Sequence, residues 1–141
     1  MNSNNDKYRE LAEAAVSARK KSYCPYSHFA VGAALLTRSG KIYTGANIEN
    51  SSYTPTVCAE RVAIFSAVHA GERDFEAIAI SGGKEGEDPT DPVAPCGVCR
   101  QVMTEFADGD LKVILAMSWG YREYTLDSLM PLRFDRDSLG K

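Results

Sequence analysis

Two segments with helical periodicity, each lying between β-prone segments, constrain the fold of this chain most strongly. The first runs from Cys58 to about Ala70, and the second begins at Pro95-Cys96-Gly97 and continues through Phe106. A helix that joins two strands of one sheet forms a crossover connection, and such crossovers are right-handed. They bring helix amino termini to one edge of the sheet, where open α/β sheets bind ligands. The pattern therefore predicts a mixed α/β sheet with its ligand site at that edge.

The remaining segments complete the predicted order α-β-β-α-β-α-β-β-α, a five-stranded mixed sheet flanked by helices. Residues of about 6 to 21 form an amphipathic first helix, which Pro25 ends. Arg38-Ser39-Gly40 is a turn signal that joins the first two strands into a hairpin, and Gly71 ends the second helix. The expected strands and closing helix are Phe29 to Thr37, Lys41 to Ala46, Ala77 to Ile80, Leu111 to Met117, Tyr121 to Leu126, and Leu126 to about Met130.

Length and composition favour one globular domain that spans residues 1–141, because 141 residues with 44% hydrophobic content can bury one core. The net charge of -3 disfavours binding to nucleic-acid phosphates, which requires clustered Lys and Arg. The polar start from Met1 to Asp6 leads into no apolar signal segment, which predicts a cytoplasmic protein. Gly82 to Pro92 is expected to be a long, acidic, exposed loop.

Three of the four cysteines indicate a metal site. In a reducing cytosol, unpaired cysteines favour metal ligands or catalytic thiols over disulfides. Cys96 and Cys99 have the spacing of two metal ligands, although a redox dithiol has the same spacing. Cys58 opens one predicted helix as Cys96 opens the next, so all three sulfurs are expected near helix amino termini, where the partial positive charge favours thiolates.

Three protein ligands leave one tetrahedral position open, which is typical of catalytic zinc. A closed structural site remains an alternative, with Cys24, His28 or His69 as the fourth ligand. Glu60 lies too close to Cys58 in sequence to chelate the same ion comfortably, and it suits a proton carrier for a metal-activated water. An acidic residue in the first turn of a helix is also favourable without any catalytic role.

The proposed ligand set creates an excess of negative charge. Three thiolates around a divalent cation leave a net charge of about -1, which weakens the metal as a Lewis acid. Arg61 follows Glu60 and can donate to a thiolate from the same turn, and Arg100, which follows Cys99, is a second candidate. Each arginine could instead be a solvated surface residue.

The segments Cys58-Ala59-Glu60-Arg61 and Pro95-Cys96-Gly97-Val98-Cys99-Arg100 resemble the motifs of the cytidine deaminase family, in its small homotetrameric zinc-dependent form. The resemblance covers nearly the whole chain and includes Tyr23 to Gly32, Asn47 to Asn50, and Leu129-Met130-Pro131 followed by Phe134. It implies one Zn2+ per subunit, held by Cys58, Cys96 and Cys99. It also implies pyrimidine salvage by hydrolytic deamination of free cytidine and 2'-deoxycytidine to uridine and 2'-deoxyuridine, with release of ammonia. Glu60 would protonate ring atom N3 and then the departing amine.

The resemblance also implies the contacts to substrate. Asn47 and Glu49 would hydrogen-bond the ribose hydroxyls, the backbone N–H of Ala59 would meet the pyrimidine O2, and Phe29 would pack on the base. Tyr53 would reach into the site of a neighbouring subunit, and so would Phe134. The expected protein is therefore a homotetramer with shared active sites, a nucleoside as its ligand, and no nucleic-acid or membrane partner.

Other functions share part of this pattern of residues. A non-catalytic zinc-stabilised module or a redox protein would require Glu60 to be incidental. A deaminase of a cytosine-containing antibiotic shares the cysteine motifs but should lack the ribose-binding pair Asn47 and Glu49. A cytidylate deaminase should carry extra basic residues near the sugar site, and editing of polynucleotides requires a basic groove lined by aromatic residues.

Overall fold

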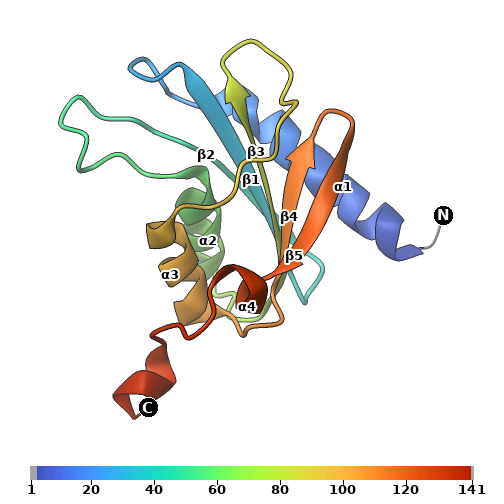
Figure 1. The fold of residues 1–141 in the computed structure, drawn as a ribbon, viewed down its shortest axis with the longest axis vertical. Helices are drawn as coiled ribbons and strands as arrows, with labels where there is room; N and C mark the ends of the chain where they lie inside the picture. The colour runs from blue at the N-terminus through green and yellow to red at the C-terminus, as the bar shows by residue number, and fades with distance from the viewer. Residues whose placement is uncertain (1–2, 141) are drawn as a thin grey trace.

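The computed structural model describes residues 3–140, which are arranged around a five-stranded sheet with the strand order β2-β1-β3-β4-β5 (Figure 1). The elements follow one another as α1 (Ser3–Ala18), η1 (Arg19–Lys21), β1 (Phe29–Thr37), β2 (Ile42–Ala46), α2 (Ala59–His69), β3 (Phe75–Lys84), α3 (Gly97–Phe106), β4 (Lys112–Met117), β5 (Gly120–Thr125), α4 (Leu126–Leu129) and η2 (Arg136–Leu139).

The sheet is mixed. β3 and β4 are parallel, and the other three neighbouring pairs are antiparallel. α2 connects β2 to β3, and α3 connects β3 to β4, so the two predicted crossover helices are present. The hairpins β1–β2 and β4–β5 form the two ends of the sheet. The predicted fold class and element order are confirmed.

Both faces of the sheet are covered. α1 lies across one face, and α2 and α3 lie on the other (Figure 1). Side chains alternate along a strand, so Ala33 and Leu35 of β1 pack in the core beside α2 and α3, while Ala34 and Leu36 pack beneath α1. This burial on both faces explains why β1 is a nearly continuous apolar run rather than an alternating one.

A close approach of helix to strand sets where α2 begins. A Cβ atom at Gly45 of β2 would lie 2.5 Å from the carbonyl oxygen of Ala59. Because glycine has no side chain, the first turn of α2 can rest directly on β2. Ala59 follows Cys58, so this packing also places the first proposed metal ligand.

The predicted start of the first helix is wrong, because the helix begins at Ser3 rather than near residue 6. Its α-helical part ends at Ala18 and η1 continues to Lys21, so the predicted end near residue 21 is correct, but it comes before Pro25. After η1 the backbone becomes extended at Ser22, because the N–H of Tyr23 bonds to the carbonyl of Asn47 at 2.9 Å. A long-range contact therefore ends the helix before proline can.

The segment from Gly82 to Pro92 is not one exposed loop. β3 continues to Lys84, so Gly82 and Gly83 belong to the strand, and Pro89 is buried. A Cβ at Gly82 would lie 3.0 Å from the ring of Phe29, and one at Gly83 would lie 3.1 Å from Nη2 of Arg19. The glycines occur in this strand because other side chains occupy the space above them. Within residues 3–140, the helices are too short or too polar to cross a membrane.

Candidate metal centre and substrate site

The three predicted ligands lie together at the amino termini of α2 and α3. Cys58 is the residue that caps α2, Cys96 caps α3, and Cys99 lies in the first turn of α3. The Sγ atoms of Cys58 and Cys96 are 3.8 Å apart, and those of Cys96 and Cys99 are 3.5 Å apart. Zn–S bonds of about 2.3 Å in a tetrahedral site separate two sulfurs by about 3.8 Å. The cluster therefore fits a zinc ion.

Within residues 3–140 this cluster contains three ligand side chains, and Cys24 and both histidines lie outside it. Among the described residues, the cluster therefore has no fourth ligand side chain that would make it a closed structural site. Three thiolate ligands with one position left for water are the arrangement of a catalytic zinc site.

Hydrogen bonds within the cluster change the pKa values of the cysteines in ways that favour binding of a cation. Donation from Cys99 and from Arg61 lowers the pKa of Cys58 to about 5, so this sulfur is a thiolate at neutral pH. The hydrogen bond with Cys58, together with burial, raises the pKa of Cys99. Because a metal ligand must lose its proton, a bound cation is what allows Cys99 to ionise. The donor set thus favours a divalent metal such as zinc.

Glu60 lies in the first turn of α2 with only 4% of its surface exposed. Burial raises the pKa of Glu60 to about 7, because desolvation disfavours the charged carboxylate. A carboxyl group with a pKa near neutrality can both accept and donate a proton at physiological pH. Its position beside the thiolates suits the proton carrier that the sequence predicts.

The two arginines that flank the ligands differ in their contacts. Nη2 of Arg61 donates to Sγ of Cys58 at 3.6 Å, as the charge argument predicts. Arg100 donates to the carbonyl of Pro95 at 2.8 Å and to that of Leu129 at 2.6 Å. Arg100 therefore connects the loop before Cys96 to the end of α4 through hydrogen bonds. Of the two arginines, Arg61 is the one whose guanidinium contacts a thiolate.

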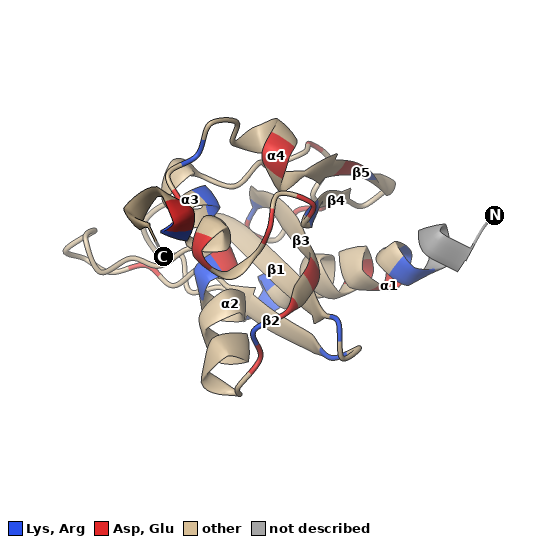
Figure 2. Cartoon of the chain, turned by 90° about the horizontal axis from the view of Figure 1, so that it is seen from below, with Lys and Arg blue, Asp and Glu red and all other residues tan. Residues whose placement is uncertain are grey.

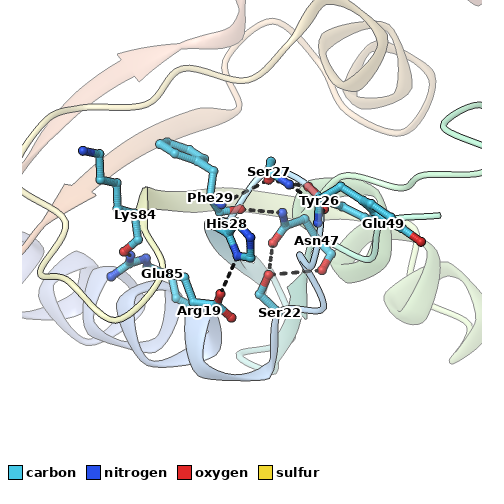
Figure 3. Close-up of polar contacts among 10 residues, drawn as sticks. All are labelled: Arg19, Ser22, Tyr26, Ser27, His28, Phe29, Asn47, Glu49, Lys84 and Glu85. Carbon is cyan, nitrogen blue, oxygen red and sulfur yellow. Dashed lines mark hydrogen bonds and ion pairs between the residues drawn. The ribbon is translucent and has the colours of Figure 1, made fainter. Parts of the chain in front are cut away.

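A second cluster contains Asn47, Glu49 and Phe29 (Figure 3). Nδ2 of Asn47 donates to the carbonyl of Phe29 at 2.9 Å, and Oε1 of Glu49 accepts from two backbone N–H groups. Phe29 opens β1 with 37% of its surface exposed. Three residues proposed to bind substrate are thus close together, and their side chains retain access to solvent.

Backbone pairing links this cluster to the metal ligands. Ile48 exchanges two hydrogen bonds of 3.0 Å with Val57, the residue before Cys58. Asn47 and Glu49 flank Ile48, and residues two apart in an extended segment point to the same side. Ala59, which follows Cys58, is buried at the start of α2, where backbone N–H groups have no acceptor within the helix.

The remaining two predicted substrate residues are exposed on this chain. Tyr53 is 72% exposed, has φ 64°, and borders a cavity of about 380 Å³ with Glu49. Phe134 is 60% exposed, and its carbonyl accepts a hydrogen bond from Gln101 at 2.7 Å. Both aromatic rings are available to contact another molecule.

The sequence interpretation missed two serines that hydrogen-bond to the second cluster and a buried arginine that joins backbone segments beside it. The hydroxyl of Ser22 donates to Oδ1 of Asn47, and that of Ser27 donates to Oε2 of Glu49. Arg19 is buried and donates to three backbone carbonyls, at Ala30, Lys84 and Glu87. Their sequence shows no periodicity or motif that would single them out, because each acts through partners distant in the chain.

A mixed α/β sheet, three cysteine sulfurs at helix amino termini and a buried carboxyl group beside them are together the features of a zinc-dependent hydrolytic enzyme. Residues 5–117 match the family model of the cytidine and deoxycytidylate deaminase zinc-binding region. The chain therefore belongs to this family of deaminases.

Similar proteins agree with this assignment. Cytidine deaminase of Sporosarcina psychrophila is 47% identical over 131 residues, which cover 92% of this chain and 93% of that protein. The crystal structure of cytidine deaminase from Burkholderia pseudomallei has 48% sequence identity and a TM-score of 0.81, covering 90% of this chain and 98% of the other. Blasticidin-S deaminase of Bacillus cereus is 35% identical over 132 residues, 91% of this chain and 92% of that protein.

Proposed function

We propose that this chain removes the exocyclic amine of free cytidine and 2'-deoxycytidine by hydrolysis, as a step of pyrimidine salvage. The observation that carries this proposal is the buried Glu60 carboxyl group, which interacts with Cys58 and Cys99, two of the three cysteines whose sulfurs fit zinc. The nearby pair Asn47 and Glu49 adds the polar groups that a sugar requires.

Bound zinc supplies the activated water that attacks C4 of the cytosine ring, which is the established chemistry of zinc deaminases as a class. Glu60 would accept one proton from that water and deliver it to ring atom N3. It would then accept the remaining proton of the water, from the hydroxyl on C4, and deliver it to the departing amine. The bond from C4 to the amine breaks, ammonia leaves, and C4 keeps the oxygen as the carbonyl of uridine. Cys58, Cys96 and Cys99 hold the metal, and Arg61 offsets their charge.

The substrate contacts follow from the second cluster. Asn47 and Glu49 bind ribose hydroxyls, and the exposed ring of Phe29 packs on the base. The backbone N–H of Ala59, at the amino terminus of α2, donates to the pyrimidine O2. Its position at a helix amino terminus supports this role, because the N–H groups there have no partner within the helix.

Deaminases of other substrates are the nearest competitors. The likeness to a blasticidin-S deaminase makes an antibiotic the second candidate. The pair Asn47 and Glu49 favours a nucleoside, since a sugar offers the hydroxyl groups that an amide and a carboxylate bind. Polynucleotides are disfavoured by the net charge of -3, and acidic and basic segments are interspersed on the side of the ribbon that Figure 2 shows.

We also propose a homotetramer whose subunits share active sites through Tyr53 and Phe134. The exposure of both aromatic side chains supports this arrangement. Residues 1–141 are proposed to form a single catalytic domain, in agreement with the family match over residues 5–117. A cytoplasmic location is supported by the four free cysteines, because a reducing compartment keeps thiolates available for a metal.

Ammonia release from a panel of substrates tests the choice of substrate. The panel contains cytosine, cytidine, 2'-deoxycytidine, cytidylate and blasticidin S. We expect kcat/KM for the two nucleosides to exceed that for each of the other compounds by at least about a hundredfold, because those compounds lack the sugar contacts or add a charge. A chain active only on cytidylate or only on blasticidin S would contradict the proposal.

A further inference from the structure

The hydrogen bonds around Asn47 determine which donor and acceptor groups of its side chain remain for a ligand (Figure 3). Oδ1 accepts from the hydroxyl of Ser22 and from the N–H of Val31 at 2.9 Å, which together use both lone pairs. Nδ2 donates one of its two hydrogens to the carbonyl of Phe29. Within residues 3–140, the amide of Asn47 therefore keeps one N–H donor for a ligand, and its oxygen is fully used.

Glu49 keeps a hydrogen-bond acceptor for a ligand, where Asn47 keeps a donor. Its Oε1 accepts from the N–H groups of Tyr26 at 3.0 Å and Ser27 at 3.1 Å, and its Oε2 accepts from the hydroxyl of Ser27. The hydrogen bond from the Ser27 hydroxyl, followed by the backbone donors, lowers the pKa of Glu49. The group is therefore a carboxylate at neutral pH, and Oε2 retains a lone pair for a ligand.

Ser27 also connects this carboxylate to the residue that faces the base. The Ser27 oxygen accepts from the N–H of Phe29 at 3.0 Å while its proton goes to Glu49. Because Asn47 binds the carbonyl of Phe29, both polar backbone groups of Phe29 are held by the same network.

We propose that Ser22 and Ser27 are positioning residues that set Asn47 as a donor and Glu49 as an acceptor for one ribose hydroxyl. That hydroxyl accepts from Nδ2 of Asn47 and donates to Oε2 of Glu49. The inference rests on the proposed function, and it specifies which sugar contact is a donor and which is an acceptor. A phosphate group at the same place would be repelled by Glu49, because it offers negative charge and no proton.

The location of the two serines argues against a merely structural role. Ser27 is exposed and Ser22 is half-buried, so water could satisfy either hydroxyl at little cost to folding. What water cannot do is hold Glu49 and Asn47 in one orientation before the substrate arrives.

Kinetics with two nucleosides separate positioning from stability. The variants are Ser27→Ala and Ser22→Ala, with Ser27→Thr to restore the hydroxyl and Ser17→Ala, on the exposed side of α1, as the matched control. With cytidine, we expect Ser27→Ala to raise KM about tenfold and Ser22→Ala about threefold, with kcat within about twofold of the parent. With 2',3'-dideoxycytidine, which lacks the 2' and 3' hydroxyls, parent and variants should have the same KM.

The threonine variant should return KM for cytidine to within about twofold of the parent, and Ser17→Ala should match the parent throughout. Equal losses on both nucleosides, or an unchanged KM for cytidine in Ser27→Ala, would overturn the positioning role. A parent chain that deaminates neither nucleoside would instead overturn the proposed function on which this role depends.

Discussion

At the residue scale, Arg61 extends from the same turn of α2 as Glu60 and donates to Sγ of Cys58 at 3.6 Å. The hydrogen bond to Cys58 raises the pKa of Arg61, so the guanidinium stays fully charged. Three thiolates on one divalent cation carry an excess of negative charge, and a fixed guanidinium beside one of them reduces it.

We expect Arg61→Gln to lower kcat for cytidine about tenfold while one zinc remains bound per chain. Without the guanidinium, the sulfurs donate more charge to the metal and weaken it as a Lewis acid. Arg61→Lys keeps the positive charge, so its kcat for cytidine should fall less than that of Arg61→Gln. Steady-state kinetics and elemental analysis measure both quantities, and a variant with full zinc content and the kcat of the parent would show that the guanidinium has no such role.

The sequence predicts the residues of the metal centre but not the serines that hydrogen-bond to Asn47 and Glu49. Cys58, Cys96 and Cys99 can be recognised because ligand spacing and helix starts are local features of the chain. Ser22 and Ser27 bond to side chains 25 and 22 residues away. No periodicity marks such a pairing, so these two residues become visible only in three dimensions.

At the element scale, α1 docks on the sheet through a polar contact at its start. The hydroxyl of Tyr8 donates to Oε2 of Glu76 at 3.2 Å, and Nζ of Lys7 lies 2.6 Å from the same oxygen. Burial, followed by the charge of Glu76, raises the pKa of Tyr8 to about 12. The neutral form of Tyr8 is therefore the one that the folded protein stabilises.

This contact predicts how stability depends on pH. The pKa of Tyr8 is higher in the folded chain than in the unfolded chain, where it is about 10. The stabilisation is complete below pH of about 10 and is lost as pH rises toward 12, because the unfolded chain then binds fewer protons. We expect Tyr8→Phe to make the free energy of unfolding fall less steeply over this range. Urea titrations at several pH values measure the slope, and identical slopes in parent and variant would contradict the account.

The elements themselves show where sequence interpretation succeeds and where it fails. The apolar run predicts a buried strand from Ala77 to Ile80, but β3 extends from Phe75 to Lys84. The extension contains Gly82 and Gly83, which have low β propensity. Packing against Phe29 and Arg19 overrides that propensity, and neither partner is near β3 in the sequence.

At the scale of the whole molecule, the topology brings distant segments to one site. α2 and α3 both begin at the edge where their cysteines meet, and the bridge between Ile48 and Val57 joins the segment of Asn47 and Glu49 to the first metal ligand. The order of elements could be predicted from periodicity, and so could this shared edge. The exposure of Tyr53 and Phe134 could not, because aromatic residues are most often buried or half-buried.

The central claim is that Glu60 moves protons beside a zinc ion held by three cysteines. The most direct test compares the parent with Glu60→Gln, which keeps the shape of the side chain and removes its ability to carry a proton. We expect the rate of cytidine deamination to fall about a thousandfold, with one zinc per chain and an unchanged Tm. A variant that retains zinc and converts cytidine at the rate of the parent would contradict the account.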